Sequence, residues 1–434
     1  MSIQADEFQT RRQRLMAETG PGSLVLVASA KEILRNGDSA YPFRQDSDFW
    51  YLTGLNEPEA VLVLRPGRES GEQLLFLRER DPERERWDGA RLGIDGAREQ
   101  LGMDDAFPIQ DLDDIVPNLM EGCDRLFHLV GKDSGFDQRV LGWRNQLRTR
   151  SKGEKGPGEI VSLEHLLHEA RLIKSSDEIR CMRRAASIAS QAMTRAMRHC
   201  RTGMNEAEIQ AELMHEYQRH GCPPSYLPIV AGGRNALILH YITNNQPLPD
   251  DGLLLIDAGC EFENYAADIS RTFPVNGHFS PAQRDVYEVV LAAQQAAIDQ
   301  VRVGRPYQAF HDAAVRTLTE GLIDLKLLSG SVDDNIQEQH FRRFYMHKTG
   351  HWLGLDVHDV GDYQIDGESR LLERNMVVTV EPGLYIGDED DIPEPLRNIG
   401  IRIEDDVRVT SSDPEVLTRA VPSSIDDIEQ VMQA

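Results

Sequence analysis

Four acidic residues in the C-terminal half of the chain stand at or beside apolar, strand-like segments, and this placement constrains the fold more than any other feature. Asp257 ends the apolar run Leu253–Ile256, and Asp268 lies in the next strand-like segment. Glu381 follows the apolar run VVTV, and Glu404 follows the alternating segment GIRI. An ionised carboxylate is costly to bury without a partner. The fold must therefore give each of these groups either solvent or a compensating cation.

Each carboxylate also has an ordinary structural interpretation. Asp257 alone could cap a turn, and Glu381 could be a structural glutamate at a strand end. If the segments of Asp257 and Asp268 pair as a hairpin across the turn-like Glu-Asn of GCEFENYAA, both aspartates can face one side of the sheet. Period-2 alternation places Arg402 and Glu404 on the same strand face. That pair could equally be an exposed ion pair on a half-buried sheet.

Three histidines occur close together in the segment MHKTGHWLGLDVHD. They are His347, His351 and His358, and the intervening stretch Trp352–Val357 is mostly apolar. Such a cluster is compatible with metal binding or catalysis, but also with buried histidines that only satisfy hydrogen bonds. The zinc-peptidase motif HExxH is absent from the sequence.

Considered together, the four carboxylates and the imidazole favour a metal site. Converging carboxylates raise one another's pKa unless cations lie between them. Two divalent ions would balance four carboxylates and leave His351 as a neutral ligand. Oxygen donors with one nitrogen and no thiolate suit manganese more naturally than structural zinc. Paired ions about 3.5–4 Å apart can hold a hydroxide and polarise a carbonyl, which is the chemistry of metal-assisted hydrolysis.

Composition excludes several other classes of protein. The formal net charge is −25, with 47 Lys and Arg against 72 Asp and Glu, which argues against nucleic-acid binding. No apolar run approaches the roughly 20 residues of a membrane span, and the N-terminus has no apolar signal-peptide core. The five cysteines are scattered without a CxxC pair. This usage is typical of a reducing compartment, so we expect a cytoplasmic protein without a membrane partner.

Local patterns predict two differently built parts. In the first third, short apolar runs alternate with polar, helix-like stretches, as in an α/β domain. The runs are Ser23–Ala28, Ala60–Leu64, Leu74–Leu77 and Leu126–Val130, and the helix-like stretches include Phe8–Thr19 and Gln138–Arg148. The segment Ser151–Glu159 is rich in Gly, Pro and charge and predicts an exposed loop. A boundary is expected near Leu172–Lys174.

The remainder of the chain predicts long helices beside hairpins, which favours an α+β architecture. Ser175 and Glu178 form a capping-box pattern, a second helix is expected over Asn205–His220, and Ser280 precedes Pro281 at another helix start. A further helix is expected near Phe310–Leu328. Two helices, a histidine-bearing loop and a pair of strands occur twice in this order, which suggests a duplicated fold without sequence identity between the halves.

The motifs resemble those of a known family. The segments IDAGCE, AADISRTFPVNG, HWLGLDVHDVG, VEPGLYI and GIRIEDD closely resemble the pita-bread metallopeptidases, and within them the aminopeptidase P (Xaa-Pro aminopeptidase) family. YPFRQDSDFWYLTGLNEPEAVLVL is similar to that family's N-terminal domain. The resemblance implies a smaller α/β creatinase-like domain over residues 1–173, followed by an α+β pita-bread catalytic domain over residues 174–434. It also implies release of the N-terminal residue from peptides with proline in second position.

The resemblance further implies a role for each motif residue. Asp257 would bind one metal ion, Asp268 and Glu404 would bridge two, and His351 and Glu381 would complete the second site. The expected ions are two manganese ions, with attack by a metal-bridging hydroxide. The remaining implied site residues, catalytic or substrate-binding, are Glu381 as proton shuttle, His358 at the scissile carbonyl, His240 and His347 near the proline, Tyr226 and Arg402 as a supporting pair, and Asp38 from the N-terminal domain.

Other activities within the pita-bread family remain alternatives for this chain, and two of its segments depart from the family pattern. A prolidase, which cleaves only Xaa-Pro dipeptides, is the nearest rival, and creatinase-type or methionine-aminopeptidase activities are more remote. A pita-bread binding module without catalysis should lack metal ligands, whereas all five are present here. MHKTGH replaces a more typical MHGLSH, and SYLPIVAGG replaces a stretch like SYNTIVGSG. The family also implies a homodimer or homotetramer acting on peptide substrates.

Overall fold

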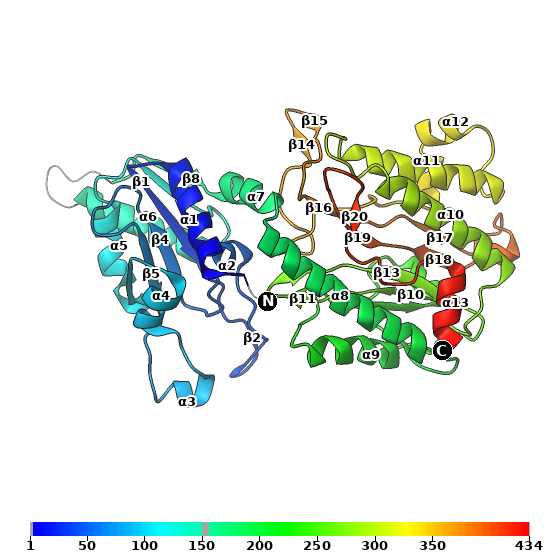
Figure 1. The fold of residues 1–434 in the computed structure, drawn as a ribbon, viewed down its shortest axis with the longest axis horizontal. Helices are drawn as coiled ribbons and strands as arrows, with labels where there is room; N and C mark the ends of the chain where they lie inside the picture. The colour runs from blue at the N-terminus through cyan, green and yellow to red at the C-terminus, as the bar shows by residue number, and fades with distance from the viewer. Residues whose placement is uncertain (1–2, 150–155, 434) are drawn as a thin grey trace. The chain divides into compact units, whose positions relative to one another are not determined.

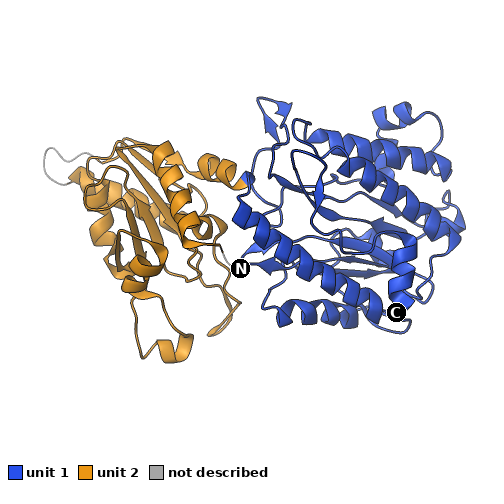
Figure 2. Ribbon diagram, viewed as in Figure 1, with its two compact units in different colours: residues 1, 172–434 blue, residues 2–171 orange. Residues whose placement is uncertain are grey.

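The chain forms two compact units in a computed structural model that describes residues 3–149 and 156–433. The first unit comprises residues 2–171 and the second residues 172–434 with residue 1 (Figure 2). Within the described residues, no helix is both long enough and apolar enough to cross a membrane. The predicted loop Ser151–Glu159 lies partly outside the described residues, and its last residue, Glu159, begins a strand.

The first unit is a six-stranded mixed sheet with helices packed against it (Figure 1). The strands, in spatial order, are β6 (Asp105–Pro108), β5 (Gln73–Leu77), β4 (Val61–Leu64), β1 (Ser23–Ala28), β7 (Arg125–His128) and β8 (Glu159–Ser162). The helices are α1 (Ala5–Thr19), α2 (Ser47–Thr53), α3 (Glu85–Asp88), α4 (Gly93–Leu101), α5 (Leu112–Met120), α6 (Ser134–Thr149) and α7 (Glu164–Leu172). A hairpin of β2 (Leu34–Asn36) and β3 (Ser39–Ala40) projects from this unit.

The apolar runs of the first third form the central strands, as predicted. β1, β4 and β5 are almost completely buried, because parallel and mixed sheets covered by helices need apolar residues on both faces. The side chains of Val116 in α5 and of Val140 and Trp143 in α6 belong to this core. The run Leu126–Val130 was predicted too long: β7 ends at His128, and the amide of Val130 turns back to the carbonyl of His128.

The second unit places its strands between two pairs of long helices (Figure 1). Its helices are α8 (Ser176–His199), α9 (Glu206–Arg219), α10 (Pro281–Ile298), α11 (Gln308–Asp324), α12 (Val332–Gln337) and α13 (Ile425–Gln433). Its strands are β9 (Ile229–Gly232), β10 (Leu253–Asp257), β11 (Glu261–Phe262), β12 (Tyr265–Ala266), β13 (Ser270–Pro274), β14 (Gln364–Ile365), β15 (Glu368–Ser369), β16 (Val377–Val380), β17 (Gly383–Ile386), β18 (Ile399–Arg402), β19 (Asp405–Arg408) and β20 (Glu415–Val416).

Local signals positioned the helices of this unit well. The side chains of Ser175, Asn205 and Ser280 each form a capping box with the residue three positions later. Such caps satisfy amide groups that the helix itself leaves free, so they mark helix starts from sequence alone. The helix predicted near Phe310–Leu328 ends earlier, at Asp324, because Lys326 adopts a positive φ of 62° that an α-helix does not allow.

The hairpin that carries the two aspartates is longer than a simple turn. β10 pairs with β13, and the shorter hairpin β11–β12 is inserted between them, with Glu263 and Asn264 at positive φ in its turn. Asp268 consequently lies two residues before β13 rather than within it. Its amide is 3.3 Å from both carboxylate oxygens of Asp406 instead of from a neighbouring strand's carbonyl.

Candidate metal centre

Two short antiparallel ladders in one common register bring Glu381 and Glu404 together. β16 pairs with β19, Val380 opposite Asp405, and β17 pairs with β18, Gly383 opposite Arg402. Glu381 and Glu404 therefore occupy equivalent positions at the step between the ladders. The Glu381 amide donates to the carbonyl of residue 349 at 2.8 Å, and the Glu404 amide donates to that of residue 270 at 3.0 Å. These bonds connect both glutamates to the neighbouring segments that carry the other ligands.

Two glycines allow the segments of the centre to approach closely. A Cβ on Gly350 would lie 2.0 Å from the carbonyl oxygen of Thr379, so the backbone before His351 can run against β16 only with glycine there. A Cβ on Gly259 would lie 1.7 Å from the carbonyl oxygen of Ala267, beside the two aspartates. Any side chain at either position would push a ligand-bearing segment away.

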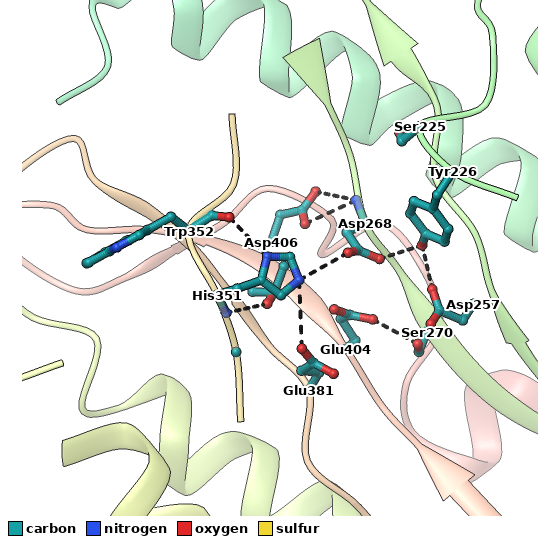
Figure 3. A network of polar contacts seen from close by, with 12 residues as sticks. Ser225, Tyr226, Asp257, Asp268, Ser270, His351, Trp352, Glu381, Glu404 and Asp406 are labelled. Carbon is teal, nitrogen blue, oxygen red and sulfur yellow. Dashed lines mark hydrogen bonds and ion pairs between the residues drawn. The ribbon is translucent and has the colours of Figure 1, made fainter. Parts of the chain in front are cut away.

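Asp268, His351 and Glu404 converge on one point. One ligand atom from each lies within 4.8 Å of the others, and the three come from separate parts of the chain. His351 Nε2 is 3.4 Å from Asp268 Oδ2 and 3.8 Å from Glu381 Oε1. The other ring nitrogen of His351 is 3.0 Å from the carbonyl oxygen of Trp352, which fixes the ring orientation (Figure 3). Nε2 is thus the nitrogen available to a metal ion.

Asp257 joins this group through Tyr226 and Arg402. The Tyr226 phenol oxygen is 2.5 Å from Oδ1 of both Asp257 and Asp268 (Figure 3). Arg402 Nη2 donates to Asp257 Oδ2 at 2.6 Å, and Arg402 Nε donates to Ser270 Oγ at 2.9 Å. Ser270 in turn donates to Glu404 Oε2 at 2.8 Å. Tyr226 and Arg402 therefore orient the carboxylates from behind, as a supporting pair.

The charges of the centre are strongly coupled. Burial raises the pKa of Glu381 to about 7, and burial with the neighbouring carboxylates raises that of Glu404 well above its usual range. Burial opposes the charged form of His351 as well, but Asp268 and Glu381 outweigh it and raise its pKa to about 9. Burial also raises the pKa of Asp257.

These pKa shifts and the types of donor atom show whether the site suits a metal ion. Four crowded carboxylates hold excess negative charge that divalent cations would neutralise. Oxygen-rich donors with one imidazole match hard or borderline divalent ions. The residues present therefore fit a divalent metal centre.

A cavity of about 960 Å³ opens onto the centre. Arg402 and the four carboxylates line one end, and much of the rest is apolar. The predicted residues His240, His347 and His358 all line it. His347 Nε2 is 2.9 Å from the Tyr385 hydroxyl, and the His358 ring contacts the His351 ring edge-on with centroids 4.3 Å apart. Such a mostly apolar cavity with a few convergent polar groups is typical of a small-ligand site.

Asp38 is the one predicted site residue that belongs to the first unit. It lies in the turn between β2 and β3 and is exposed within that unit. Its role at the centre stays a prediction.

Several residues of the site were not among the residues predicted from the sequence. The segment 307–311 and Thr349 line the cavity, and Thr349 Oγ1 is 2.8 Å from His311 Nδ1. Tyr307 donates to the carbonyl of Gly350 at 2.5 Å. Asp406 is buried next to Asp268. Of these, only Asp406 had a signal, as the second aspartate of GIRIEDD, because its neighbour Glu404 was already a candidate.

Known proteins resemble this chain over almost its whole length. Residues 180–411 match the model of "Metallopeptidase family M24", and residues 8–128 match that of "Aminopeptidase P, N-terminal domain". The Xaa-Pro aminopeptidase of Haemophilus influenzae is 46% identical over 428 residues, which cover 98% of this chain and 97% of the relative.

Solved structures agree with this similarity. Aminopeptidase PepP of Pseudomonas aeruginosa superposes with a TM-score of 0.98 at 50% identity, covering 100% of this chain and 98% of its own. A zinc-substituted Escherichia coli aminopeptidase P in complex with product superposes with a TM-score of 0.97 at 45% identity, covering 100% and 99%.

Proposed function

The chain belongs to metallopeptidase family M24, with an aminopeptidase P N-terminal domain, and on that premise we propose how its site performs the family's reaction. Its function is that of an Xaa-Pro aminopeptidase, a metal-dependent hydrolase that releases an N-terminal residue preceding proline. The predicted fold class, a pita-bread domain after a smaller α/β domain, is confirmed. The convergence of Asp268, His351 and Glu404 carries the assignment of the site.

The proposed metal centre holds two divalent ions. Asp268 and Glu404 would contribute a carboxylate to both ions, Asp257 would be a ligand of one ion, and His351 and Glu381 would be ligands of the other. The distances of 3.4 and 3.8 Å from His351 Nε2 to Asp268 and Glu381 support this grouping. The preference for oxygen donors supports manganese as the resident ion. When bound, the ions would supply an activated water molecule and polarise the scissile carbonyl.

The protein's own groups would then handle protons and the substrate. Glu381 lines the cavity beside the proposed ions, so its carboxylate would accept a proton from water and return it to the leaving proline nitrogen. His358 would donate a hydrogen bond to the scissile carbonyl oxygen. His240 and His347 would contact the substrate near the proline ring. Because proline has no amide hydrogen, recognition would rely on the apolar cavity wall.

We also propose the wider setting of this enzyme. The domain boundary would lie between residues 173 and 174, next to the change of compact unit. The scattered, buried cysteines support a cytoplasmic location. The family resemblance supports a homodimer or homotetramer, and light scattering at several protein concentrations would distinguish these states from a monomer.

The deciding experiment is metal-dependent hydrolysis of a Xaa-Pro-Xaa tripeptide. We expect manganese to stimulate release of the first residue, with little cleavage of a tripeptide that lacks proline. A Xaa-Pro dipeptide serves as the matched substrate for the prolidase alternative, and a preference for it would contradict the proposal. Absence of any metal-stimulated cleavage would instead indicate a binding protein.

Substitution of Asp268 tests the metal assignment directly. Asp268→Ala should lose at least one of the two ions and reduce kcat by about 10³-fold or more, since a shared carboxylate is removed. Metal content by mass spectrometry and kcat should change together. Asp406→Asn, at the buried neighbour, provides a control that should keep both ions bound. Two tightly bound ions and full activity in Asp268→Ala would disprove the assignment.

A further inference from the structure

The loop of residues 352–359, here called the His358 loop, presents His358 to the cavity without a helix or strand of its own. Its first residues are held by β16: Trp352 forms an isolated bridge with Val378, and the Leu353 amide donates to the carbonyl of Val377 at 3.0 Å. Among the described residues, the His358 ring contacts the His351 ring and makes no hydrogen bond. The orientation of His358 therefore depends on how the far end of its loop is held.

Asp359 holds that far end from inside the loop. Its side chain is 1% exposed, and its amide donates to the carbonyl of Trp352 at 2.9 Å, which closes the loop. The Asp356 amide points at Asp359 Oδ1 from 3.4 Å. A Cβ on Gly354 would lie 2.1 Å from Asp359 Oδ2, so the chain wraps tightly around this carboxylate.

The partner of this carboxylate comes from the other end of the unit's sequence. Lys174 lies between α7 and α8, and its side chain is also 1% exposed. Its Nζ donates to Asp359 Oδ2 at 3.0 Å and is 3.4 Å from the carbonyl of Leu172, while its amide donates to the carbonyl of Asn375 at 3.1 Å. The ion pair thus connects the first residues of the second unit to the His358 loop.

Burying two charges is not an efficient way to stabilise a fold. The desolvation penalty of a buried ion pair commonly cancels its attraction, and apolar residues of similar volume often serve stability as well or better. What an ion pair adds is direction, because the ammonium group and the carboxylate must meet in a defined geometry. We propose that Lys174 and Asp359 are positioning residues, whose buried ion pair holds the His358 loop so that His358 faces the cavity.

The neighbouring metal ligand is held independently. The His351 amide donates to Thr379 Oγ1 at 3.0 Å, and the Thr379 amide donates to the carbonyl of His351 at 3.0 Å. Neither bond involves the ion pair. Loss of the pair should consequently affect His358 while leaving the metal centre loaded. The inference rests on the proposed role of His358 at the scissile carbonyl. Its test must therefore distinguish a failure of the positioning role of the ion pair from a failure of the role of His358.

The test compares single substitutions with a charge-free pair. Lys174→Met and Asp359→Asn should each lower Tm, because each removes one charge of a buried ion pair and leaves the other charge buried. The double variant Lys174→Met/Asp359→Leu should recover most of the lost Tm and bind as much metal as the parent. Its kcat should nevertheless stay about 10- to 100-fold below the parent, the usual result of a misplaced catalytic group. Arg302→Met/Asp413→Leu, at an exposed ion pair of the same unit, should leave kcat unchanged.

A double-mutant cycle with His358→Ala shows whether the lower kcat of the charge-free pair arises from a displaced His358. If His358→Ala lowers kcat, adding it to the charge-free pair should lower kcat by less than about 2-fold further, since both changes remove one contribution. Multiplicative losses, or parental kcat in the charge-free variant, would overturn the inference. If His358→Ala alone retains parental kcat, the proposed role of His358 is wrong. The positioning claim is then decided by a crystal structure of the charge-free variant: a displaced loop supports it, and an unmoved loop rejects it.

Discussion

At the scale of single residues, His311 shows how the cavity wall controls charge. It lies on α11, lines the cavity and contacts Thr349. Burial, with a smaller contribution from Lys348, lowers the pKa of His311 to about 4. The side chain is therefore neutral near pH 7, although four carboxylates line the same cavity. A neutral imidazole adds no further positive charge to the cavity wall, which already carries Arg402 and Lys348.

The lowered pKa predicts a pH-dependent contribution to stability. The neutral form of His311 is favoured in the folded state, so its contribution is complete above the unfolded pKa of about 6.5 and is lost as pH falls towards 4. The free energy of unfolding of the parent should therefore decrease over this window by up to about 3 kcal/mol more than that of His311→Gln. Urea titrations at several pH values measure the difference. His215→Gln, at an exposed histidine, should retain the parental dependence, and an identical profile for His311→Gln would contradict the prediction.

Lys348 predicts a preference among substrates. It replaces a glycine of the more typical family segment, lines the cavity and is exposed, and in the described residues it has no ion-pair partner. Peptides with an acidic residue after proline should have a higher kcat/KM than those with a basic one. Lys348→Gly should reduce that ratio by up to about 5-fold, since an exposed charge pair contributes roughly 0.2–1 kcal/mol.

A matched lysine controls for the loss of charge alone. Lys326 is also exposed in the second unit, but it does not line the cavity. Lys326→Gly should leave the substrate ratio unchanged. High salt should weaken the preference of the parent, and an undiminished ratio in Lys348→Gly would exclude Lys348 as its source.

At the scale of elements, the site depends on how irregular segments are attached to helices and strands. The segment between β9 and β10 carries His240, and Glu206 at the start of α9 holds it. The Glu206 side chain is fully buried and accepts four hydrogen bonds at 2.8–2.9 Å, from the amides of Gly232 and Gln246 and the side chains of Asn235 and Tyr241. One carboxylate at a helix N-terminus thus holds the segment that brings His240 to the cavity.

Replacing Glu206 by glutamine should disrupt the segment that carries His240. A glutamine side chain has only one acceptor oxygen, and its NH2 group is itself a donor. The two donors that bonded to the replaced oxygen would therefore lose their hydrogen bonds. We expect Glu206→Gln to lower the free energy of unfolding by about 2–4 kcal/mol and to raise KM. Glu208→Gln, in the exposed capping box of the same helix turn, should cost about 1 kcal/mol or less. Equal losses for the two variants in urea unfolding would be evidence against the special role of Glu206.

At the scale of the whole molecule, the negative charge has two components. Most of the net charge of −25 belongs to the surface, but Asp257, Asp268, Glu381 and Glu404 converge in the second unit. All the proposed metal ligands come from this unit and none from residues 2–171. Metal binding should therefore stabilise one unit selectively, because a ligand stabilises only the structure that binds it.

Calorimetry with and without metal tests this expectation. Chelation should abolish activity and lower the Tm of the transition that belongs to residues 172–434. Added manganese should restore the activity and the Tm. At a hundredfold excess over Kd, it should increase the free energy of unfolding of this unit by about 2.7 kcal/mol. The Tm of the transition that belongs to the first unit should not change. In Asp268→Ala, added manganese should raise the Tm of the second unit only slightly. An equal shift of all transitions would contradict a centre confined to the second unit.

Local chemistry made much of the fold predictable. Capping residues such as Ser175, Asn205 and Ser280 act within one helix turn, so their effect is visible in the sequence itself. Buried strands such as β1 likewise appear as continuous apolar runs. Element ends were less predictable where distant contacts decide them, as at Asp268, whose amide binds the carboxylate of Asp406 instead of extending β13.

The sequence by itself determined which residue types were available for a metal centre, because carboxylates beside apolar strands need cations wherever the chain places them. Only the tertiary structure decided that the ladders of Glu381 and Glu404 share one register, that His311 lines the same cavity, and that Lys174 meets Asp359 across 185 positions of sequence. These contacts join segments far apart in the chain. Their energies depend on distances that no local pattern specifies.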